Sequence, residues 1–301
     1  MKKVLSVACA LCMTTAMLTG CGSSNNAGTA ATGEAQNSAA ASTTTEQAST
    51  ATDAGTTLIA LITMDSLDQH WVTLNEGAQK AAAELGVTVQ FMAPNTKDDA
   101  QQIECVNNAV SAGAQAIIVA ANGPDAISSA LREASDAGVK LIYVDSPANV
   151  SAEATFSTDN NAAGKTAGEE MKKALADAGV TSGSIGIINV NAATDSCVMR
   201  EEGFRSAFEG TDFELLETQY GEGDAAKSQS IAENYITQGV VGIFGCNEGS
   251  TTGAGNAIKA SGKDNVIGVG FDKSDAILGL IDDGYLLLSL IHISEPTRRR
   301  G

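Results

Sequence analysis

From residue 58 onward, apolar runs of strand length alternate with segments whose apolar residues recur at helical spacing. Continuous apolar runs are expected for parallel strands that are covered on both faces, and helical stripes for the helices that cover them. A glycine precedes most of the runs, where a left-handed residue would end a helix. The predicted strands are 58–63, 87–92, 116–120, 141–144, 185–190, 213–216, 240–244 and 266–269. The helical stripes lie in 71–85, 127–134 and 163–178, and the glycines are Gly86, Gly113, Gly138, Gly179, Gly239 and Gly262.

This repeating unit predicts an α/β fold, and its rhythm breaks once. Between Gly138 and Gly179, residues 146–161 are inserted between a strand and the next helix. We interpret the break as a crossover between two doubly wound lobes, 58–157 and 158–287, joined by a hinge. Eight βα units would also suit a single closed barrel, which is the alternative fold, although a barrel offers no reason for the interruption.

The N-terminus has the features of an export signal. Lys2 and Lys3 precede a short apolar stretch, 4–17, and Leu-Thr-Gly-Cys ends it at Cys21. The stretch is too short for a permanent membrane span, and its ending resembles a lipobox, in which the cysteine is acylated. We therefore expect a lipoprotein signal peptide over 1–20 and a lipid anchor on Cys21. The Gly-, Ser-, Asn-, Ala- and Thr-rich segment 21–57 is expected to be a disordered tether.

The last residues, 288–301, do not continue the repeating pattern. They end in Glu-Pro-Thr-Arg-Arg-Arg-Gly, a string that looks like translated adapter sequence. We interpret 288–301 as an artefactual tail, so that the fold is incomplete at its C-terminus. The chain as written should then have low stability and an exposed sheet edge in its first lobe.

Charge and residue usage exclude several classes of function. A formal charge of −18 disfavours binding to nucleic acid. After export, Cys105, Cys197 and Cys246 form an odd set that gives no disulfide framework, and we expect buried thiols. His70 is the only histidine before the tail, no residue set has metal-ligand spacing, and no cofactor is expected. The sequence therefore favours a binding protein over an enzyme, with a glycoside-cleaving pair of carboxylates, Asp145 and Asp272, as the weaker alternative.

Polar side chains follow nearly every predicted strand. Ligands of open parallel sheets bind beyond the carboxyl ends of the strands, so two such rims could hold a polyhydroxylated ligand between them. Each of these residues could instead cap a helix or form a turn. The residues that follow the strands are Asp65, Asp68, Asn95, Asn122, Asp145, Asn191, Tyr220, Asn247 and Asp272.

Three residues add a sharper signal. Arg200 occupies an apolar stripe, three residues after Cys197 and four before Phe204, so its guanidinium needs a partner or a cleft. We expect it to donate to a ligand oxygen, or else to form an internal ion pair with Asp195 or Asp272. His70 and Trp71 open a helix beside the predicted cleft, where the indole could stack on a sugar face or join the core.

Five segments resemble the ribose-binding-like branch of the type I periplasmic binding proteins. They are Asp68–Ala78, Leu141–Asp145, Ser157–Asn160, Val198–Phe204 and Val269–Asp272, and the likeness runs from about residue 58 to 285. The chain departs from the family pattern at Asp68, His70 and Trp71, where Asn and two Phe are frequent, and at Ser146, where Arg is frequent. These departures count against ribose itself as the ligand.

The resemblance implies a function, a location and a set of binding residues. It implies a monomeric, extracytoplasmic solute-binding lipoprotein of an ABC importer, anchored to the cell membrane, that delivers a sugar-like ligand to a permease. A receptor for chemotaxis or for a sensor kinase is the alternative. The implied contacts with a monosaccharide come from Asp68, His70, Trp71, Asp145, Arg200, Asn247 and Asp272, with Asn122 and Thr158 as weaker matches.

Overall fold

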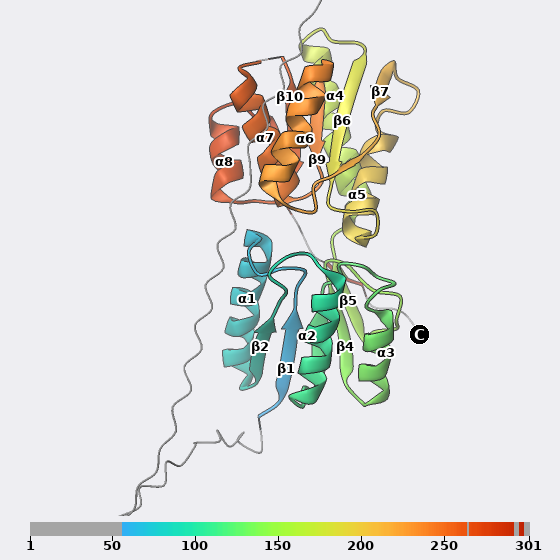
Figure 1. Cartoon of the computed structure of the whole chain (residues 1–301), viewed down its shortest axis with the longest axis vertical. Coiled ribbons are helices and arrows are strands. Elements are labelled where there is room, and N and C mark those ends of the chain that lie inside the picture. Colours follow the sequence, from blue (N-terminus) through green and yellow to red (C-terminus); the bar gives the residue numbers. More distant parts are fainter. Residues whose placement is uncertain (1–55, 264, 292–294, 298–301) are drawn as a thin grey trace, which may run out of the picture. The chain divides into compact units, whose positions relative to one another are not determined.

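The computed structural model describes residues 56–263, 265–291 and 295–297 (Figure 1). The predicted signal peptide, the anchor Cys21 and nearly all of the predicted tether lie outside these residues. In the described part of the chain, no helix has both the length and the apolar character that a bilayer span requires.

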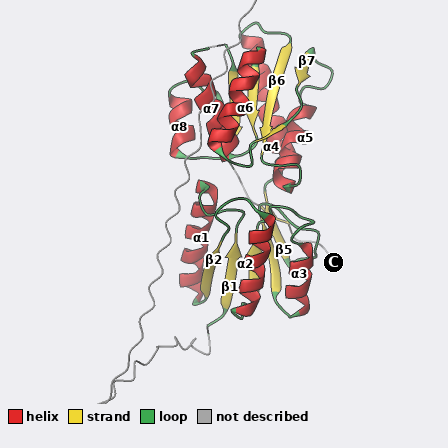
Figure 2. Ribbon diagram, in the orientation of Figure 1, coloured by secondary structure: helices red, strands yellow, loops and turns green. Residues whose placement is uncertain are grey.

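Two open sheets, each covered by helices, confirm the α/β prediction (Figure 2). The first sheet has the order β12-β5-β4-β3-β1-β2, and its first five strands in the sequence are all parallel to one another. The eight-fold barrel is therefore wrong, because these strands form an open sheet. The bounds are β1 Leu58–Ile62, β2 Thr88–Met92, β3 Ala116–Val119, β4 Lys140–Val144, β5 Ala154–Ser157 and β12 Glu295–Thr297.

The second sheet repeats the topology of the first. Its order is β11-β10-β9-β6-β7, with β8 also paired to β6, and all of these pairings are parallel. Apart from β8 and β12, both sheets thus follow the doubly wound order 2-1-3-4-5. The bounds are β6 Gly183–Asn189, β7 Phe213–Leu215, β8 Gln219–Tyr220, β9 Gly242–Gly245, β10 Ile267–Phe271 and β11 Leu288–Leu290.

Helices begin and end where the sequence provides caps. Asp or Asn side chains accept backbone N–H groups at the starts of α1, α2, α4, α6 and α7, and all six predicted glycines have positive φ. Asp68 and Asn247 are among these caps, so the capping alternative holds for both residues. The helices are α1 Gln69–Leu85, α2 Asp99–Ser111, α3 Ser128–Asp136, α4 Asn160–Asp177, α5 Asp195–Ser206, α6 Ala225–Gln238, α7 Glu248–Ser261 and α8 Asp275–Asp282.

Each lobe has its own apolar core. Ile62, Val106, Ile117 and Leu131 belong to the core of the first lobe, and Met171, Leu175, Ile187, Phe204 and Phe244 to a core of the second. Most of the predicted stripes are buried in this way. Leu85, the last residue of α1, is an exception, with 75% of its surface exposed.

The chain crosses between the lobes after β5, and part of the expected tail forms strands. The chain leaves β5 after Ser157 and enters α4, the first element of the second lobe, at Asn160. Residues 288–290, which we assigned to the tail, form β11 beside β10. β12 then pairs antiparallel with β5, so the first sheet ends at β12 and β2. The artefactual origin of the tail stays a prediction.

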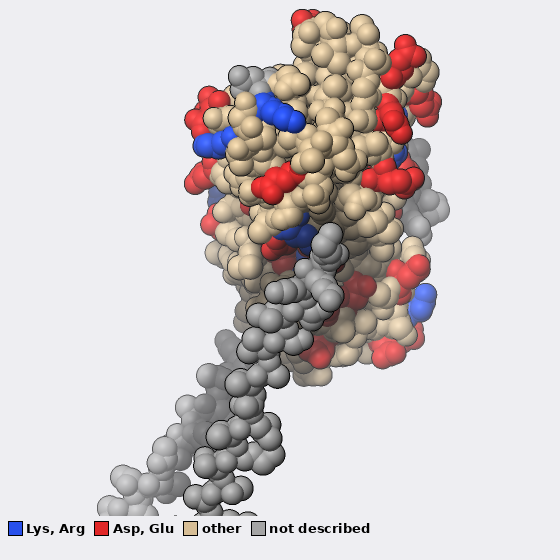
Figure 3. All heavy atoms as spheres, turned by 45° about the horizontal axis from the view of Figure 1, so that its top comes forward, with Lys and Arg blue, Asp and Glu red and all other residues tan. Residues whose placement is uncertain are grey.

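Acidic side chains dominate the face of the molecule drawn in Figure 3. They are spread over it, whereas Lys and Arg are sparse. This distribution agrees with the net charge of −18 and is unlike the basic surface that a nucleic-acid-binding protein needs.

Candidate functional site

A small cavity is lined by residues of both lobes, at the carboxyl ends of the strands. Its volume is about 20 Å³, which is room for about one water molecule. Seven of the nine predicted ligand contacts line it, including Asp145 from the first lobe and Asp272 from the second. The lining residues are Met64, Asp68, His70, Trp71, Lys97, Asp145, Val190, Ser196, Cys197, Arg200, Asn247 and Asp272.

Asp145 and Asp272 reach the cavity through the same backbone arrangement. Each follows the strand at the same place in its sheet, β4 or β10, and has positive φ, 60° for Asp145 and 75° for Asp272. Asp tolerates this left-handed conformation better than most residues with a side chain. Each aspartate is 5% exposed, so the turn directs a carboxylate into the cavity instead of into bulk solvent.

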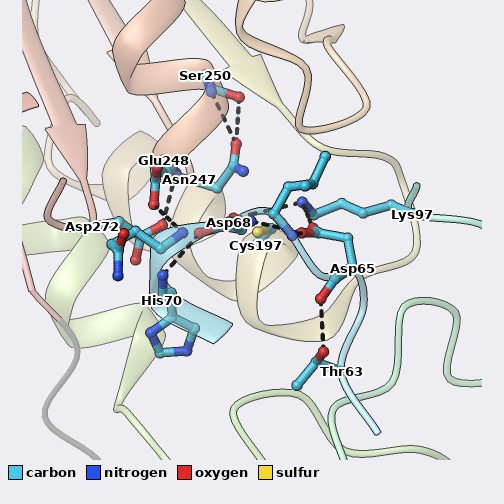
Figure 4. A network of polar contacts seen from close by, with 12 residues as sticks. Thr63, Asp65, Asp68, His70, Lys97, Cys197, Asn247, Glu248, Ser250 and Asp272 are labelled. Carbon is cyan, nitrogen blue, oxygen red and sulfur yellow. Dashed lines mark hydrogen bonds and ion pairs between the residues drawn. The ribbon is translucent and has the colours of Figure 1, made fainter. Parts of the chain in front are cut away.

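Hydrogen bonds to the start of α7 position the second-lobe side chains (Figure 4). The Asp272 carboxylate accepts from the Glu248 backbone N–H at 2.7 Å. The Asn247 amide oxygen accepts from the Ser250 N–H and hydroxyl at 3.2 and 2.7 Å. The Asn247 Nδ2 group is buried and has no hydrogen-bond partner, so a donor lines the cavity and is available to a ligand. Because leaving a buried donor without a hydrogen bond is costly, Asn247 Nδ2 favours a ligand that offers a hydrogen-bond acceptor.

Arg200 is fully buried and supplies positive charge to the cavity. Its Nε and Nη2 groups donate to Asn160 Oδ1 at 3.2 and 2.8 Å, and Nη1 donates to the carbonyl of Cys246. The guanidinium lies over the ring of Phe271, with Cζ 3.5 Å from the ring centre. These contacts hold the guanidinium group in one orientation, as expected for an arginine that recognises oxygen atoms.

His70 and Trp71 form the first-lobe wall at the start of α1. Trp71 is 3% exposed and packs in a small apolar cluster with Met64, Ala120 and Val144. The indole N–H is buried without a partner, and the ring therefore serves both the core and the cavity. The His70 ring lies edge-on to the indole, and its Nε2 is 3.8 Å from Asp145 Oδ2.

The two weaker matches lie outside the lining of this cavity. Asn122 is buried. Its side-chain Nδ2 donates to Asp99 Oδ1 at 2.6 Å, and its backbone carbonyl accepts from the Thr194 hydroxyl at 2.7 Å. Thr158 lies in the crossover between β5 and α4, and its carbonyl accepts from Asn160 Nδ2. Their roles as ligand contacts stay predictions.

Lys97 and Glu248 belong to the site and were not predicted. Lys97 lies five residues after the end of β2, in the polar run 95–99. Of this run, only Asn95 was named as a residue that follows a predicted strand. Glu248 begins α7 directly after Asn247, and the acidic first turn of a helix is usually read as a dipole effect. The position of both after predicted strands was the signal that could have identified them.

The carboxyl group of Glu248 lies among other acids and reaches the first lobe. Its Oε2 accepts from the Gln69 N–H at 3.0 Å, and a side-chain hydrogen bond joins it to Asp68. Burial, the hydrogen bond with Asp68 and the negative charges of Asp68 and Asp272 raise the pKa of Glu248 to about 8. Burial and the charge of Asp272 also raise the pKa of Asp68. The hydrogen bond between Glu248 and Asp68 therefore joins the lobes, and the raised pKa values of both groups favour a proton on this pair.

Further hydrogen bonds connect the lobes beside the cavity. The Ser146 and Ser196 hydroxyls are 2.9 Å apart, and the Ser196 N–H donates to Ser146 Oγ at 3.0 Å. Ser146 is the position where the resembling family frequently has Arg. In this chain the position forms a contact between the lobes.

Within the described residues, no group of three or more His, Cys, Asp or Glu side chains is placed to hold a metal ion. Cys105, Cys197 and Cys246 are free thiols, and burial raises the pKa of Cys197 to about 11. Cys197 and Cys246 are buried as expected, and Cys105 is half-buried. The Cys197 thiol at the cavity is thus an uncharged group, unsuited to nucleophilic chemistry.

Comparisons with known proteins agree with this architecture. Residues 59–291 match the family model described as periplasmic binding protein domain. The chain is 26% identical to the ribose import binding protein of Escherichia coli (strain K12) over 81% of each chain, and 28% identical to that of Haemophilus influenzae over 80% of this chain and 81% of the relative.

A solved structure supports the same assignment. The periplasmic component of an ABC-type sugar transport system from Hahella chejuensis superposes with a TM-score of 0.73 at 25% identity, covering 78% of this chain and 87% of that one. The family match spans most of the described chain and includes both sheets. This chain therefore belongs to the periplasmic binding proteins, in their type I form with two doubly wound lobes.

Proposed function

We propose that this protein is the extracytoplasmic solute-binding protein of an ABC importer and that it binds a monosaccharide or a related polyol between its lobes. The observation that carries the proposal is the cavity itself, which combines acceptors, donors and an aromatic wall from both lobes. Hydroxyl groups both donate and accept, so they can satisfy Asp145 and Asp272 together with Arg200 and Asn247. The relatives named as ribose import binding proteins support a sugar as the ligand.

Binding requires the lobes to move. Ligand sites usually measure about 300–1,000 Å³, whereas this cavity holds about 20 Å³, so a sugar enters only when the lobes separate. The chain passes between the sheets at residues 157–160, and these few residues can absorb the rotation. A ligand that contacts both lobes then stabilises the closed state by its differential contacts.

A thermal-shift screen of pentoses, hexoses and sugar alcohols tests the proposal. We expect at least one of them to raise the melting temperature, and the shift to disappear in Arg200→Ala. Because this substitution also removes buried hydrogen bonds, circular dichroism must first show that the variant is folded. A protein stabilised by no member of the screen contradicts the proposal.

The transport assignment has two rivals with distinct outcomes. An enzyme acting through Asp145 and Asp272 would return a cleaved glycoside, whereas a binding protein returns its ligand intact. A receptor would bind the same ligand without supporting its uptake. Uptake of the labelled ligand by cells that carry the protein, lost on its deletion, favours the importer.

Anchoring by lipid at Cys21 is a separate part of the proposal. The sequence from Leu18 to Cys21 supports it. Metabolic labelling with a fatty-acid analogue should mark the exported protein, and Cys21→Ser should remove the label and release the protein from the membrane fraction. Labelling that persists in the variant would refute the assignment of Cys21.

A further inference from the structure

Lys97 is a buried lysine at the boundary of the cavity. It lies in the loop between β2 and α2, and its side chain is 8% exposed. Burial alone would lower its pKa, but the negative charges of Asp68 and Asp65 outweigh this and raise it. A lysine is rarely buried unless its charge is compensated, and here it stays an ammonium group.

Asp65 fixes the position of this ammonium group (Figure 4). Asp65 Oδ1 accepts from the backbone N–H groups of Leu67 and Asp68, both at 2.8 Å. Its other oxygen, Oδ2, accepts from Lys97 Nζ in a close contact. The backbone of its own turn thus fixes the Asp65 carboxylate, and the carboxylate fixes the Lys97 ammonium group. Such preorganisation spares a ligand the entropy of ordering a lysine.

Lys97 and Asp68 also separate two spaces. Both line the small cavity, and both line a second, more open hollow of about 280 Å³ between the lobes. The second lobe lies directly over Lys97, because a Cβ atom at Gly223 would be 2.7 Å from Nζ. The ammonium therefore lies where the lobes meet, and its surroundings are complete only when they are in contact.

The distance between Lys97 and Asp68 leaves room for a shared ligand atom. Lys97 Nζ is 3.6 Å from Asp68 Oδ2, beyond the 2.7–3.2 Å of a good N–H···O hydrogen bond. A hydroxyl oxygen placed against both could accept from the ammonium and donate its proton to the carboxylate. Because ammonium only donates and carboxylate only accepts, a ligand group that bridges the two must both accept and donate, as a hydroxyl does.

We propose that Lys97 is a specificity-determining ligand contact, which donates to one hydroxyl oxygen of the bound sugar or polyol while that hydroxyl donates to Asp68. The inference rests on the proposed function and names the ligand class more closely. The site selects a neutral polyhydroxylated molecule with a hydroxyl at this position, and it rejects the derivative that lacks that one hydroxyl. Sites that bind a hydroxyl through buried polar groups discriminate strongly against the analogue without it.

The test combines one substitution with a series of deoxy sugars. Lys97→Met keeps the aliphatic stem and removes the ammonium. Calorimetry gives the Kd of wild type and variant for the best ligand of the screen and for each of its monodeoxy derivatives. We expect the variant to bind the parent sugar about tenfold to a hundredfold more weakly. For one deoxy derivative, the two proteins should have nearly equal Kd, because the contact is already absent.

A nearby lysine supplies the matched control. Lys227 pairs with Glu222 at 2.7 Å and its side chain is 45% exposed, and it lines neither the small cavity nor the open hollow. Lys227→Met should leave every Kd unchanged. Lys97→Arg, which keeps the positive charge beside Asp65, covers the case in which Lys97→Met does not fold. The guanidinium donors of the Lys97→Arg variant lie at other positions than the ammonium, so the order of Kd values among the deoxy derivatives should change.

The outcomes distinguish a contact from a structural role. If Lys97→Met weakens the parent and every deoxy derivative by one common factor, or weakens none, the proposed contact is overturned. Retention of the wild-type ranking by Lys97→Arg overturns it too. If wild type binds no monosaccharide or polyol at all, the proposed function fails, and the inference fails with it for that separate reason.

Discussion

The two lobes deliver an aspartate to the cavity by the same hydrogen-bonded turn. The Asp145 N–H donates to Phe156 of β5 at 2.8 Å, and the Asp272 N–H donates to Leu290 of β11 at 2.7 Å. Ser157 and Ser289 each donate a hydroxyl to the carbonyl of the aspartate of their own lobe, both at 2.7 Å. Asn122 and Asn247 likewise follow strands at the same place in the two sheets, β3 and β9. The arrangement shows two copies of one rim.

The lobes differ in what surrounds these equivalent groups. In the second lobe, the Asp272 carboxylate is held by a backbone N–H of α7. In the first lobe, the Asp145 carboxylate faces the imidazole of His70. Trp71 and Lys97 are additional first-lobe contributions to the cavity wall. The difference suggests that the second lobe provides the fixed polar frame, whereas side chains of the first lobe adjust the fit to a particular ligand.

The largest expected effect is a loss of stability on truncating an aromatic ring, and the effect on binding should differ between the cavity wall of the first lobe and the core of the second. Trp71→Ala and Phe204→Ala each remove a buried aromatic ring, and each should lower the free energy of unfolding by about 3–5 kcal/mol. Phe204 stacks on Phe244 with ring centres 4.2 Å apart, away from the cavity lining. Urea denaturation measures the loss, and ligand titration of the folded variants should show weaker binding only for Trp71→Ala. Equal loss of affinity in both would remove the distinction between wall and core.

A smaller effect should be shared by the two aspartate turns. At positive φ an alanine is strained by about 1–2 kcal/mol and a glycine is not. We therefore expect Asp145→Gly to be more stable than Asp145→Ala by about 1 kcal/mol, with the same order for Asp272→Gly and Asp272→Ala. Ligand affinity should fall in all four variants. Chemical denaturation measures these stabilities. If the glycine variant is more stable than the alanine variant in only one lobe, the two turns are not equivalent.

The third expected effect is a pH dependence carried by the acid pair that joins the lobes, Glu248 of the second lobe and Asp68 of the first. With the lobes together the pKa of Glu248 is about 8, and with the lobes apart its exposed carboxyl should return towards its ordinary value of 4.5. The closed form then holds more protons between these values, so closure weakens as the pH rises from about 4.5 to about 8. The raised pKa of Asp68 acts in the same direction. Ligand affinity should fall by at least about tenfold over this interval, because each unit of pKa difference corresponds to a factor of ten.

Glu248→Gln is the control for this dependence. Glutamine keeps the size of the side chain and can donate permanently to Asp68, so calorimetric titrations between pH 5 and pH 8 should show a flatter affinity profile. An unchanged slope in the variant would assign the pH dependence to another group. Lys97 and Asp65, which adjoin Asp68, should both stay charged over this range, because the pKa of Lys97 is raised and that of Asp65 is lowered.

The sequence by itself determined the layers, most strands and the rims. Continuous apolar runs of strand length are typical of buried parallel strands, and glycines such as Gly86 and Gly262 end helices through a backbone conformation that is local. Asp145 and Asp272 were predictable site residues for the same reason, since the position of a residue after a strand fixes its place at the rim. The short strands β5, β8, β11 and β12 were missed, because segments of two to four residues carry little periodicity.

Tertiary structure alone decided which polar groups meet. Asp65 and Asp68 share one turn, but Lys97 comes from the loop after β2 and Glu248 from the other lobe, so no spacing in the sequence indicates that these groups meet. The same holds for the raised pKa of Glu248, which depends on burial and on acids distant in the chain. The physical reason is that backbone propensity acts over a few residues, whereas electrostatic and hydrogen-bonded contacts act between whichever groups the fold brings together.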